Sequence, residues 1–300
     1  MKLFYLLTIF ALSISSAIAQ TNLTQTLRAQ ILLDRNHFSV GEIDGISGSN
    51  TKRAIKAFQE ANQLSPSGQI DAGTLKALGD DGSNLLATYT VTEEDVNQPL
   101  SHSIPRTLLE MSKLDALNYT SLEEAVSEKL QISPKLLKKL NPGKKIAEGT
   151  VLITPAVGEK INTKAAKIVI TKTESSVRLY DSENRLIAFY PVSLGTPQNP
   201  PPSNGQYSVT VVIKNPDFSY SPDRYHSPGT PTSVLVKPGP NNPVGKIWID
   251  LSAEHYGIHG SPDPQNISKT ASHGCFRLTN WDASEVADLV KQGTPVVIQK

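Results

Sequence analysis

The chain has 300 residues, a formal net charge of +1, one cysteine and six histidines. This length exceeds what one hydrophobic core usually serves, so we expect several modules. A nearly neutral chain without a basic run lacks the charge that phosphate binding needs, which argues against a nucleic-acid partner. No segment after the first is long and apolar enough to span a bilayer, which argues against an integral membrane protein.

The first residues predict an export signal. Lys2 supplies a positive end, residues 3–12 are almost wholly apolar, and Ala17 with Ala19 forms a small-x-small cleavage site. Serines interrupt the apolar run early, so a permanent membrane anchor is the weaker alternative. We therefore expect residues 1–19 to be removed and the mature chain to have no membrane span.

Residues 24–79 predict a compact helical module. Apolar positions within residues 51–63 recur on one helical face, Ser49 or Asn50 can cap that helix, and a shorter helix follows at residues 74–78. The stretches GEIDGISGSNTKRAIKAFQE and GQIDAGTLKAL resemble the peptidoglycan-binding module of many cell-wall enzymes. The resemblance implies wall binding, and the alternative is a helical bundle without a ligand.

Residues 85–157 predict a small segment of mixed helix and strand. Two capping patterns mark helix starts, one at Ser121 with Glu124 and one at Ser133-Pro134. Strand-like sequence flanks these helices at residues 89–91 and 149–155. The order resembles a lysin motif (LysM), apart from a long insertion after the first strand. The resemblance implies a second glycan-binding element, with a spacer role as the alternative.

From residue 165 the periodicity changes from helical to alternating, which predicts a mostly β domain over residues 165–300. The proline-rich stretch 214–245 has little periodicity, and we expect it to be a lid. A helix is expected after Thr279, which with Asp282 forms a capping pattern. Strands are expected at residues 168–170, 177–179, 186–192, 207–213, 246–251 and 295–298.

Cys275 is the only cysteine, so it cannot form a disulfide within its own chain. A free cysteine has a pKa of about 8.5 and is only partly ionised near neutrality, so a catalytic thiol needs a base. His273 lies two positions away, whereas His259 must come from a separate strand, and the spacing alone does not choose between them. The alternative for the cysteine is a small buried hydrophobic residue.

The segments YGIHGS, residues 256–261, and SHGCFRL, residues 272–278, resemble the signature of the L,D-transpeptidase (YkuD-type) catalytic domain. The likeness extends over residues 165–300 and includes GPNNPVGKIWIDL, residues 239–251. It implies a mostly β catalytic fold with Cys275 as the nucleophile and His259 as the base. A backbone carbonyl, of Gly260 or of Ser272, is then expected to orient the imidazole.

Further roles are expected for residues around the thiol. Backbone N–H groups of Gly274 and Cys275 are suited to an oxyanion hole, because a glycine lets substrate approach the backbone closely. Arg277 offers a planar fork for a stem-peptide carboxylate, with a surface ion pair as its alternative. Tyr256 is a second candidate substrate contact. His273 is expected to brace the loop or to take a direct part in catalysis.

The resemblance implies a reaction on peptidoglycan without a cofactor. Cys275 attacks the third residue of a tetrapeptide stem, expels the terminal D-alanine and passes the acyl group to an amine. The acceptors left open are a second stem, a lipoprotein lysine, or water in an L,D-carboxypeptidase. We expect the protein in the periplasm.

Two other classes of protein are alternatives to this interpretation. A zinc site could use His255, His259, His273 and Cys275, but Gly257 and the alternating pattern argue against a helix that would join the first two. A metal is therefore not expected. The second alternative is a wall-binding protein without activity.

Overall fold

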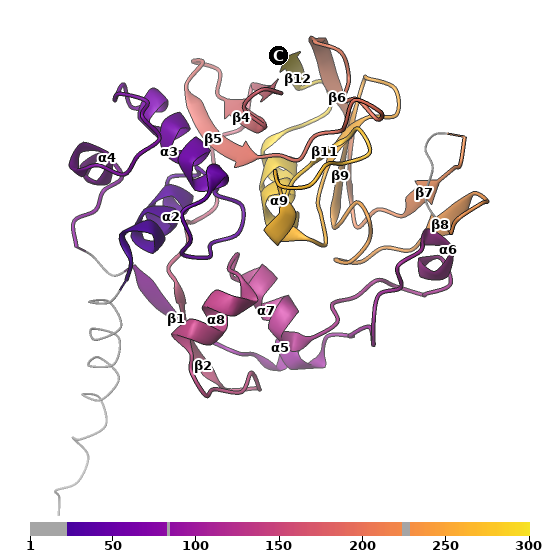
Figure 1. The fold of residues 1–300 in the computed structure, drawn as a ribbon, viewed down its shortest axis with the longest axis horizontal. Helices are drawn as coiled ribbons and strands as arrows, with labels where there is room; N and C mark the ends of the chain where they lie inside the picture. The colour runs from indigo at the N-terminus through magenta and orange to yellow at the C-terminus, as the bar shows by residue number, and fades with distance from the viewer. Residues whose placement is uncertain (1–22, 83–84, 224–228) are drawn as a thin grey trace, which may run out of the picture.

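The computed structural model describes residues 23–82, 85–223 and 229–300, and the predicted export signal lies outside these ranges. A helical N-terminal part, a middle part with a small sheet, and a β-rich C-terminal domain follow one another along the chain (Figure 1). No helix within these ranges is both long enough and apolar enough to cross a bilayer.

The N-terminal part contains helices α2 (Gln25–Arg35), α3 (Ser49–Ala61) and α4 (Ala72–Ala77). The side chain of Thr24 caps α2 and that of Asp71 caps α4 by accepting backbone N–H bonds. Helix α3 begins at Ser49 after Gly48, and no side chain caps it, so the predicted cap at Ser49 or Asn50 was wrong. The helical fold predicted for this part is confirmed.

The middle part places two antiparallel strands around its helices. Strand β1 (Leu86–Thr90) pairs with β2 (Val151–Pro155), and Ser133 caps helix α8 (Pro134–Leu140) as predicted. Ser121 caps α7, but the carboxylate of Glu124 accepts the Thr120 N–H and the Thr120 hydroxyl, so the predicted capping box is shifted by one residue. The likeness to LysM remains a prediction. The helices are α5 (Glu93–Asn97), α6 (Leu108–Met111), α7 (Leu122–Lys129) and α8 (Pro134–Leu140).

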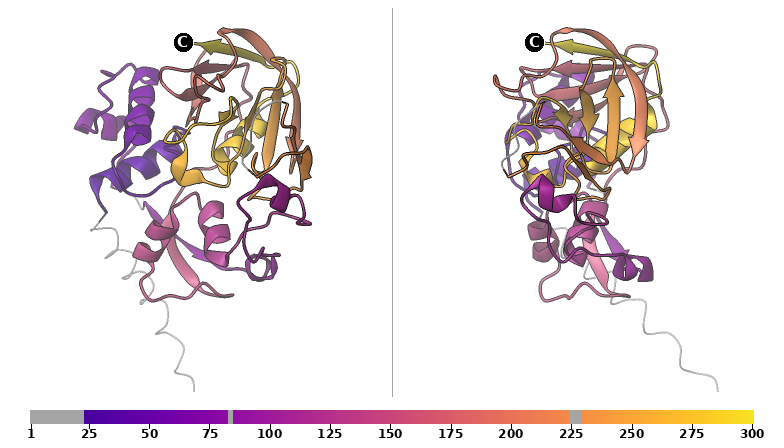
Figure 2. Two further views of the ribbon diagram at one scale, coloured as in Figure 1. Left: turned by 45° about the vertical axis from the view of Figure 1, so that its right-hand side comes forward. Right: turned by 90° about the vertical axis from the view of Figure 1, so that its right-hand side faces the viewer.

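The C-terminal domain is built on an eight-stranded sheet in the order β11-β10-β9-β6-β12-β3-β4-β5. The chain beyond β5 pairs again with β11, because Ser193 and Arg277 exchange backbone hydrogen bonds, so the sheet curves back on itself. Helix α9 (Asn280–Leu289) packs against β9 and β10 (Figure 2). The strands are β3 (Lys167–Thr171), β4 (Ser176–Tyr180), β5 (Leu186–Pro191), β6 (Gly205–Lys214), β9 (Ile247–Leu251), β10 (Gly257–His259), β11 (Phe276–Arg277) and β12 (Pro295–Gln299).

The proline-rich stretch 214–245 contains regular structure that the sequence pattern did not predict. Strands β7 (Phe218–Tyr220) and β8 (Val234–Val236) form an antiparallel hairpin that contacts α6. Beyond β8 the chain is held by Leu117, which donates a hydrogen bond to the Pro238 carbonyl and accepts one from the Asn241 N–H, each 2.9 Å long. The stretch is therefore docked on the middle part, and its role as a lid remains a prediction.

Two hydrophobic clusters form the core of the described residues. One lies within the C-terminal domain, between the sheet and α9. The other joins the N-terminal and middle parts and also includes Phe189 of β5. Backbone hydrogen bonds from Ser39 to Phe189 and from Phe189 to His37 fix this strand to the N-terminal part. The N-terminal part therefore packs against both the middle part and the C-terminal domain.

Candidate active site

Strand β10 carries His259, the predicted base, and lies between strands β9 and β11. His259 pairs with Trp248 of β9 and with Arg277 of β11. Paired residues point to the same face of a sheet, and the alternate residues Ile258 and Phe276 are fully buried in the core. Trp248, His259 and Arg277 therefore share the face opposite α9.

The loop before β11 brings Cys275 to this region. Its thiol donates to the His255 carbonyl, at 3.8 Å, and it also interacts with the backbone of Gly257, two residues before His259. The two halves of the predicted motif, although 16 positions apart in sequence, thus meet at adjacent strands. This juxtaposition is the central feature of the site.

His259 is held in one orientation. The residue is 5% exposed, and its Nδ1 lies 2.7 Å from the Gly260 carbonyl oxygen. A carbonyl only accepts, so Nδ1 carries the hydrogen and Nε2 keeps a free lone pair. The Trp248 ring stacks on the imidazole with centroids 5.7 Å apart and planes at 20°. Of the two carbonyls that the sequence left open, it is Gly260 that orients the ring.

Burial sets the charge states of the pair. Burial lowers the pKa of His259 to about 4, helped by the positive charge of Arg277 and opposed by the hydrogen bond to Gly260. Burial also raises the pKa of the Cys275 thiol, as does the charge of Asp250, while a hydrogen bond to the Gly257 backbone opposes them. Near neutral pH the site therefore holds a neutral thiol and a neutral imidazole.

Ser272 organises the loop that carries the thiol. Its hydroxyl accepts the Gly274 N–H at 3.2 Å and donates to the Cys275 carbonyl, which closes a tight turn. Gly274 has φ +116°, and a Cβ there would lie 3.1 Å from the Tyr256 ring. Because Ser272 engages the Gly274 N–H, the Cys275 N–H is the freer member of the predicted oxyanion pair.

Arg277 has no carboxylate partner within the described ranges. Its Nη2 donates to the Thr270 carbonyl at 3.1 Å and to the Thr270 hydroxyl at 2.6 Å, and its buried Nε has no hydrogen-bond partner there. The surface ion pair weighed as its alternative is not formed among these residues. The guanidinium thus remains available for an anionic group, and its substrate role remains a prediction.

Two other predicted residues lie at the rim of the site. The Tyr256 hydroxyl donates to the Pro200 carbonyl at 3.0 Å, which joins the site to the loop that follows β5. His273 is exposed on the turn before Cys275, and its role stays a prediction.

Two residues on β9 that support the site were not predicted from the sequence. Trp248 stacks on His259 and its Nε1 donates to Asp250, at 3.2 Å. Gly257 makes room for this ring, because a Cβ there would lie 2.7 Å from it. The alternation within IWIDL could have revealed both side chains, since buried isoleucines flank Trp248 and force it to the other face.

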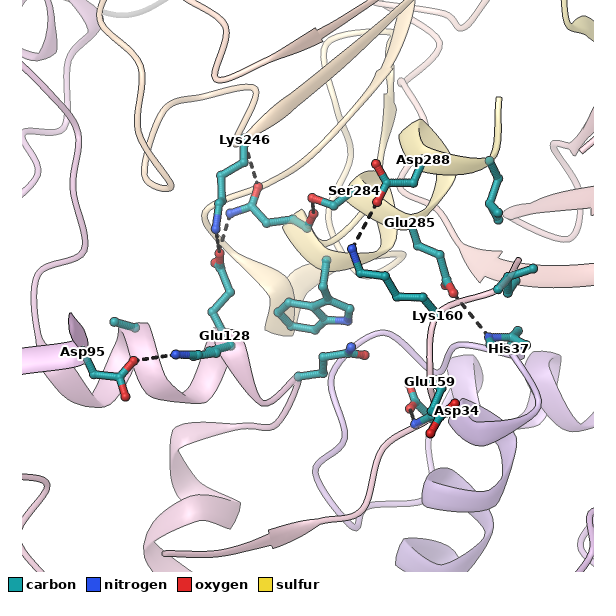
Figure 3. Close-up of a pocket in the computed structure, with 18 of the residues that line it drawn as sticks. Asp34, His37, Asp95, Glu128, Glu159, Lys160, Lys246, Ser284, Glu285 and Asp288 are labelled. Atoms are coloured by element: carbon teal, nitrogen blue, oxygen red, sulfur yellow. Dashed lines mark hydrogen bonds and ion pairs between the residues drawn. The ribbon is translucent and has the colours of Figure 1, made fainter. Parts of the chain in front are cut away.

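No cluster of three or more metal-binding side chains occurs within the ranges that the structure describes. His255 lies in the turn before β10, so it does not share a helix with His259. A cavity of about 490 Å³ lies elsewhere, between the three parts of the chain, and neither Cys275 nor His259 lines it (Figure 3). Its walls carry Glu128, Lys246 and other charged residues, most of which pair with one another (Figure 3).

Comparisons with known families agree with this geometry. Residues 165–298 match the model of the L,D-transpeptidase catalytic domain, YkuD, and residues 24–78 match a "Putative peptidoglycan binding domain". Residues 165–298 therefore form an L,D-transpeptidase catalytic domain, and residues 24–78 form a peptidoglycan-binding domain. The predicted pairing of a helical wall-binding part with a mostly β catalytic domain is confirmed.

The curated relatives point to the same family. The "Putative L,D-transpeptidase YkuD" of Bacillus licheniformis is 29% identical over 178 residues, which is 58% of this chain and 92% of that protein. The Bacillus subtilis protein of the same name is 46% identical over 61 residues, 20% of this chain and 37% of that protein. The "Probable L,D-transpeptidase YbiS" of Escherichia coli K12 is 29% identical over 49% of each chain. The chain thus spans less than half the length of the latter two.

Among solved structures, L,D-transpeptidase 3 from Mycobacterium tuberculosis is 16% identical, with a TM-score of 0.38, over 52% of this chain and 76% of that one.

Proposed function

We propose that the chain is a peptidoglycan L,D-transpeptidase in which Cys275 is the nucleophile and His259 the general base. The donor is a tetrapeptide stem, cleaved before its terminal D-alanine. The observation that carries the proposal is the anchored ring of His259, whose Nδ1 is fixed on Gly260 while Nε2 remains free on the strand beside the thiol. That arrangement suits an imidazole that removes a proton from sulfur.

The first half-reaction starts from the neutral pair. As the sulfur of Cys275 attacks the carbonyl of the third stem residue, its proton passes to Nε2 of His259. The tetrahedral intermediate collapses to a thioester, the bond to D-alanine breaks, and the leaving amine takes the proton from the imidazolium. The Cys275 N–H is suited to stabilise the oxyanion, a kind of contribution worth about 3 to 4 kcal/mol per donor in other enzymes.

The second half-reaction consumes the thioester. An acceptor amine attacks its carbonyl, His259 takes the amine proton, and the thiol is regenerated as the new amide forms. The thioester conserves the energy of the broken peptide bond, so no nucleotide is required. The acceptor amine belongs to a second stem or to a lipoprotein lysine, whereas water as the acceptor would make the enzyme an L,D-carboxypeptidase.

Substrate binding is assigned to groups around the thiol. Arg277, which lacks a carboxylate partner among the described residues, is suited to a two-point contact with a carboxylate of the stem. Tyr256, whose hydroxyl donates to the Pro200 carbonyl, lies at the rim of the site and is the second substrate contact. The N-terminal part holds the glycan or wall, residues 85–157 act as a LysM-like second glycan contact, and the protein works in the periplasm after loss of residues 1–19.

The test is intact-protein mass spectrometry during incubation with purified disaccharide-tetrapeptide. The expected result is a wild-type adduct heavier by the donor minus D-alanine, located at Cys275 by peptide mapping. Adding a second stem or a lysine-bearing lipoprotein peptide then identifies the acceptor by product mass, and a shortened stem identifies water. His259→Gln should slow adduct formation by about 100-fold or more.

Controls separate this proposal from its alternatives. Cys275→Ala should form no adduct and yet bind sacculi like the wild type, because the predicted wall-binding residues lie elsewhere. A wild-type protein that binds sacculi but never forms the adduct would instead support a non-catalytic wall-binding protein. Loss of adduct formation in excess chelator would contradict a mechanism that uses only side chains.

A further inference from the structure

The N-terminal end of α9 holds a buried side-chain amide that joins the C-terminal domain to the middle part. Asn280 is 1% exposed, and its Oδ1 accepts the Lys246 N–H at 3.0 Å. Its Nδ2 donates to the Pro240 carbonyl at 3.1 Å and to Glu128 Oε2 at 3.0 Å. This side chain therefore uses both donors and its acceptor, which fixes its orientation.

Asn280 also packs against the peptide that anchors the predicted base. A Cβ on Gly260 would lie 2.3 Å from Asn280 Oδ1, and a Cβ on Gly245 would lie 2.0 Å from the same atom. Both positions therefore need glycine to let the amide approach the backbone this closely. The carbonyl of the same residue, Gly260, accepts the His259 Nδ1–H. The side-chain amide of Asn280 therefore packs against the residue that orients the imidazole.

Glu128, on α7 of the middle part, holds Asn280 from the other side. Its carboxylate accepts the Tyr119 hydroxyl at 2.6 Å and lies 3.6 Å from Lys246 Nζ. Figure 3 shows Glu128 reaching up from α7 toward Lys246, which begins the approach to β9. Only 11% of the Glu128 side chain is exposed, so these contacts are shielded from water.

We propose that Glu128 and Asn280 are positioning residues for His259, so that the middle part helps to build the active site. Asn280 fixes the peptide of Gly260, Glu128 fixes Asn280, and the Gly260 carbonyl thereby keeps the imidazole hydrogen on Nδ1. The role rests on the proposed function of His259 as the base. It gives residues 85–157 a task beyond that of a spacer or glycan contact.

The test uses the full chain with Glu128→Ala, Asn280→Ala and the conservative Glu128→Gln, which keeps an acceptor for Asn280. Glu123→Ala is the matched control, because Glu123 lies on the same helix in an ion pair with Lys138 and away from Asn280. The single-turnover acylation rate should fall by about 10- to 100-fold in the two alanine variants, because the partner that orients the imidazole is lost. The KM should change by less than about threefold. Glu128→Gln should recover most of the rate.

A second readout does not depend on activity. Nitrogen-15 NMR of histidine-labelled protein should show His259 almost wholly as the Nδ1–H tautomer in the wild type and in Glu123→Ala. The alanine variants should show a mixture of tautomers. If Glu128→Ala does not fold, Glu128→Leu fills its volume without a hydrogen bond and takes its place.

Two results would overturn the proposal. One is a His259 tautomer in the Glu128 and Asn280 variants identical to that of the control. The other is slower acylation that Glu128→Gln fails to recover although it folds like the wild type. Absence of acylation in the wild type would instead remove the proposed function, and the NMR comparison would still decide whether these residues orient the ring.

Discussion

The charge state of Cys275 gives a prediction that separates two kinds of cysteine site. In a thiolate–imidazolium pair the cysteine is ionised well below neutral pH, whereas in a neutral pair it stays protonated until the pH reaches its own pKa. Burial raises the pKa of the Cys275 thiol above its ordinary value and lowers the pKa of His259 to about 4. At pH 7 the thiol should therefore be ionised to a smaller fraction than that of a free cysteine, and the imidazole should be neutral.

Alkylation by iodoacetamide measures this directly, because the thiolate is the reacting form and Cys275 is the only cysteine in the chain. The rate should rise about tenfold per pH unit from pH 6 to pH 9 without a plateau in that range. His259→Gln should leave this profile nearly unchanged, and Cys275→Ala supplies the blank. The same His259→Gln change should slow acylation by the natural donor by about 10² to 10⁴-fold, because only that reaction needs the base at the moment of attack.

The protonation of His259 determines how the acylation rate changes at low pH. Acylation needs the neutral imidazole, so its rate should hold as the pH falls through 6 and decline only near pH 4. Rapid alkylation at pH 5 that disappears in His259→Gln would refute the neutral pair and show that an ion pair exists in the resting enzyme.

Two further predictions concern the pH dependence of stability and the packing of Trp248 beside the active site. Burial raises the pKa of Asp34 to about 6 in the folded chain, so the stability that protonated Asp34 contributes below pH 3.8 is lost as the pH rises through 6. Asp34→Asn keeps an acceptor for the Gly158 N–H and should raise the free energy of unfolding, measured by urea denaturation, by up to about 3 kcal/mol at pH 7.5 and not at pH 3.5. Gly257→Ala, whose Cβ would meet the Trp248 ring at 2.7 Å, should cut the acylation rate by about 100-fold, whereas Gly48→Ala, which faces open space, should not; equal rates would mean that the ring moves freely.

Local signals in the sequence predicted the elements that depend on neighbouring residues. Ser133-Pro134 marked the start of α8, and alternating apolar residues marked β3, β4 and β12, because caps and side-chain alternation are local properties. The hairpin β7–β8 was missed because its flanking prolines hide the alternation, and its stability comes from α6 and the chain near Leu117.

The site was only partly readable from the sequence. The motif around Cys275 and the histidine on another strand carried the family resemblance, so the two central residues could be named. The stacking of Trp248, the choice of Gly260 as the anchoring carbonyl and the link from Glu128 to Asn280 depend on register and on contacts between distant segments. Glu128 lies 152 positions before Asn280, a separation at which no periodicity in the sequence signals contact.

The join between the N-terminal part and β5 has a consequence for how far the enzyme can reach. Phe38 forms an isolated parallel β-bridge with Phe189 of β5, and Arg178 of β4 forms an ion pair with Glu60 of α3 at 2.9 Å. The distance between a glycan strand held by the N-terminal part and the thiol of Cys275 would therefore be fixed. Such an enzyme would select stems by their spacing along the glycan and not only by their chemistry.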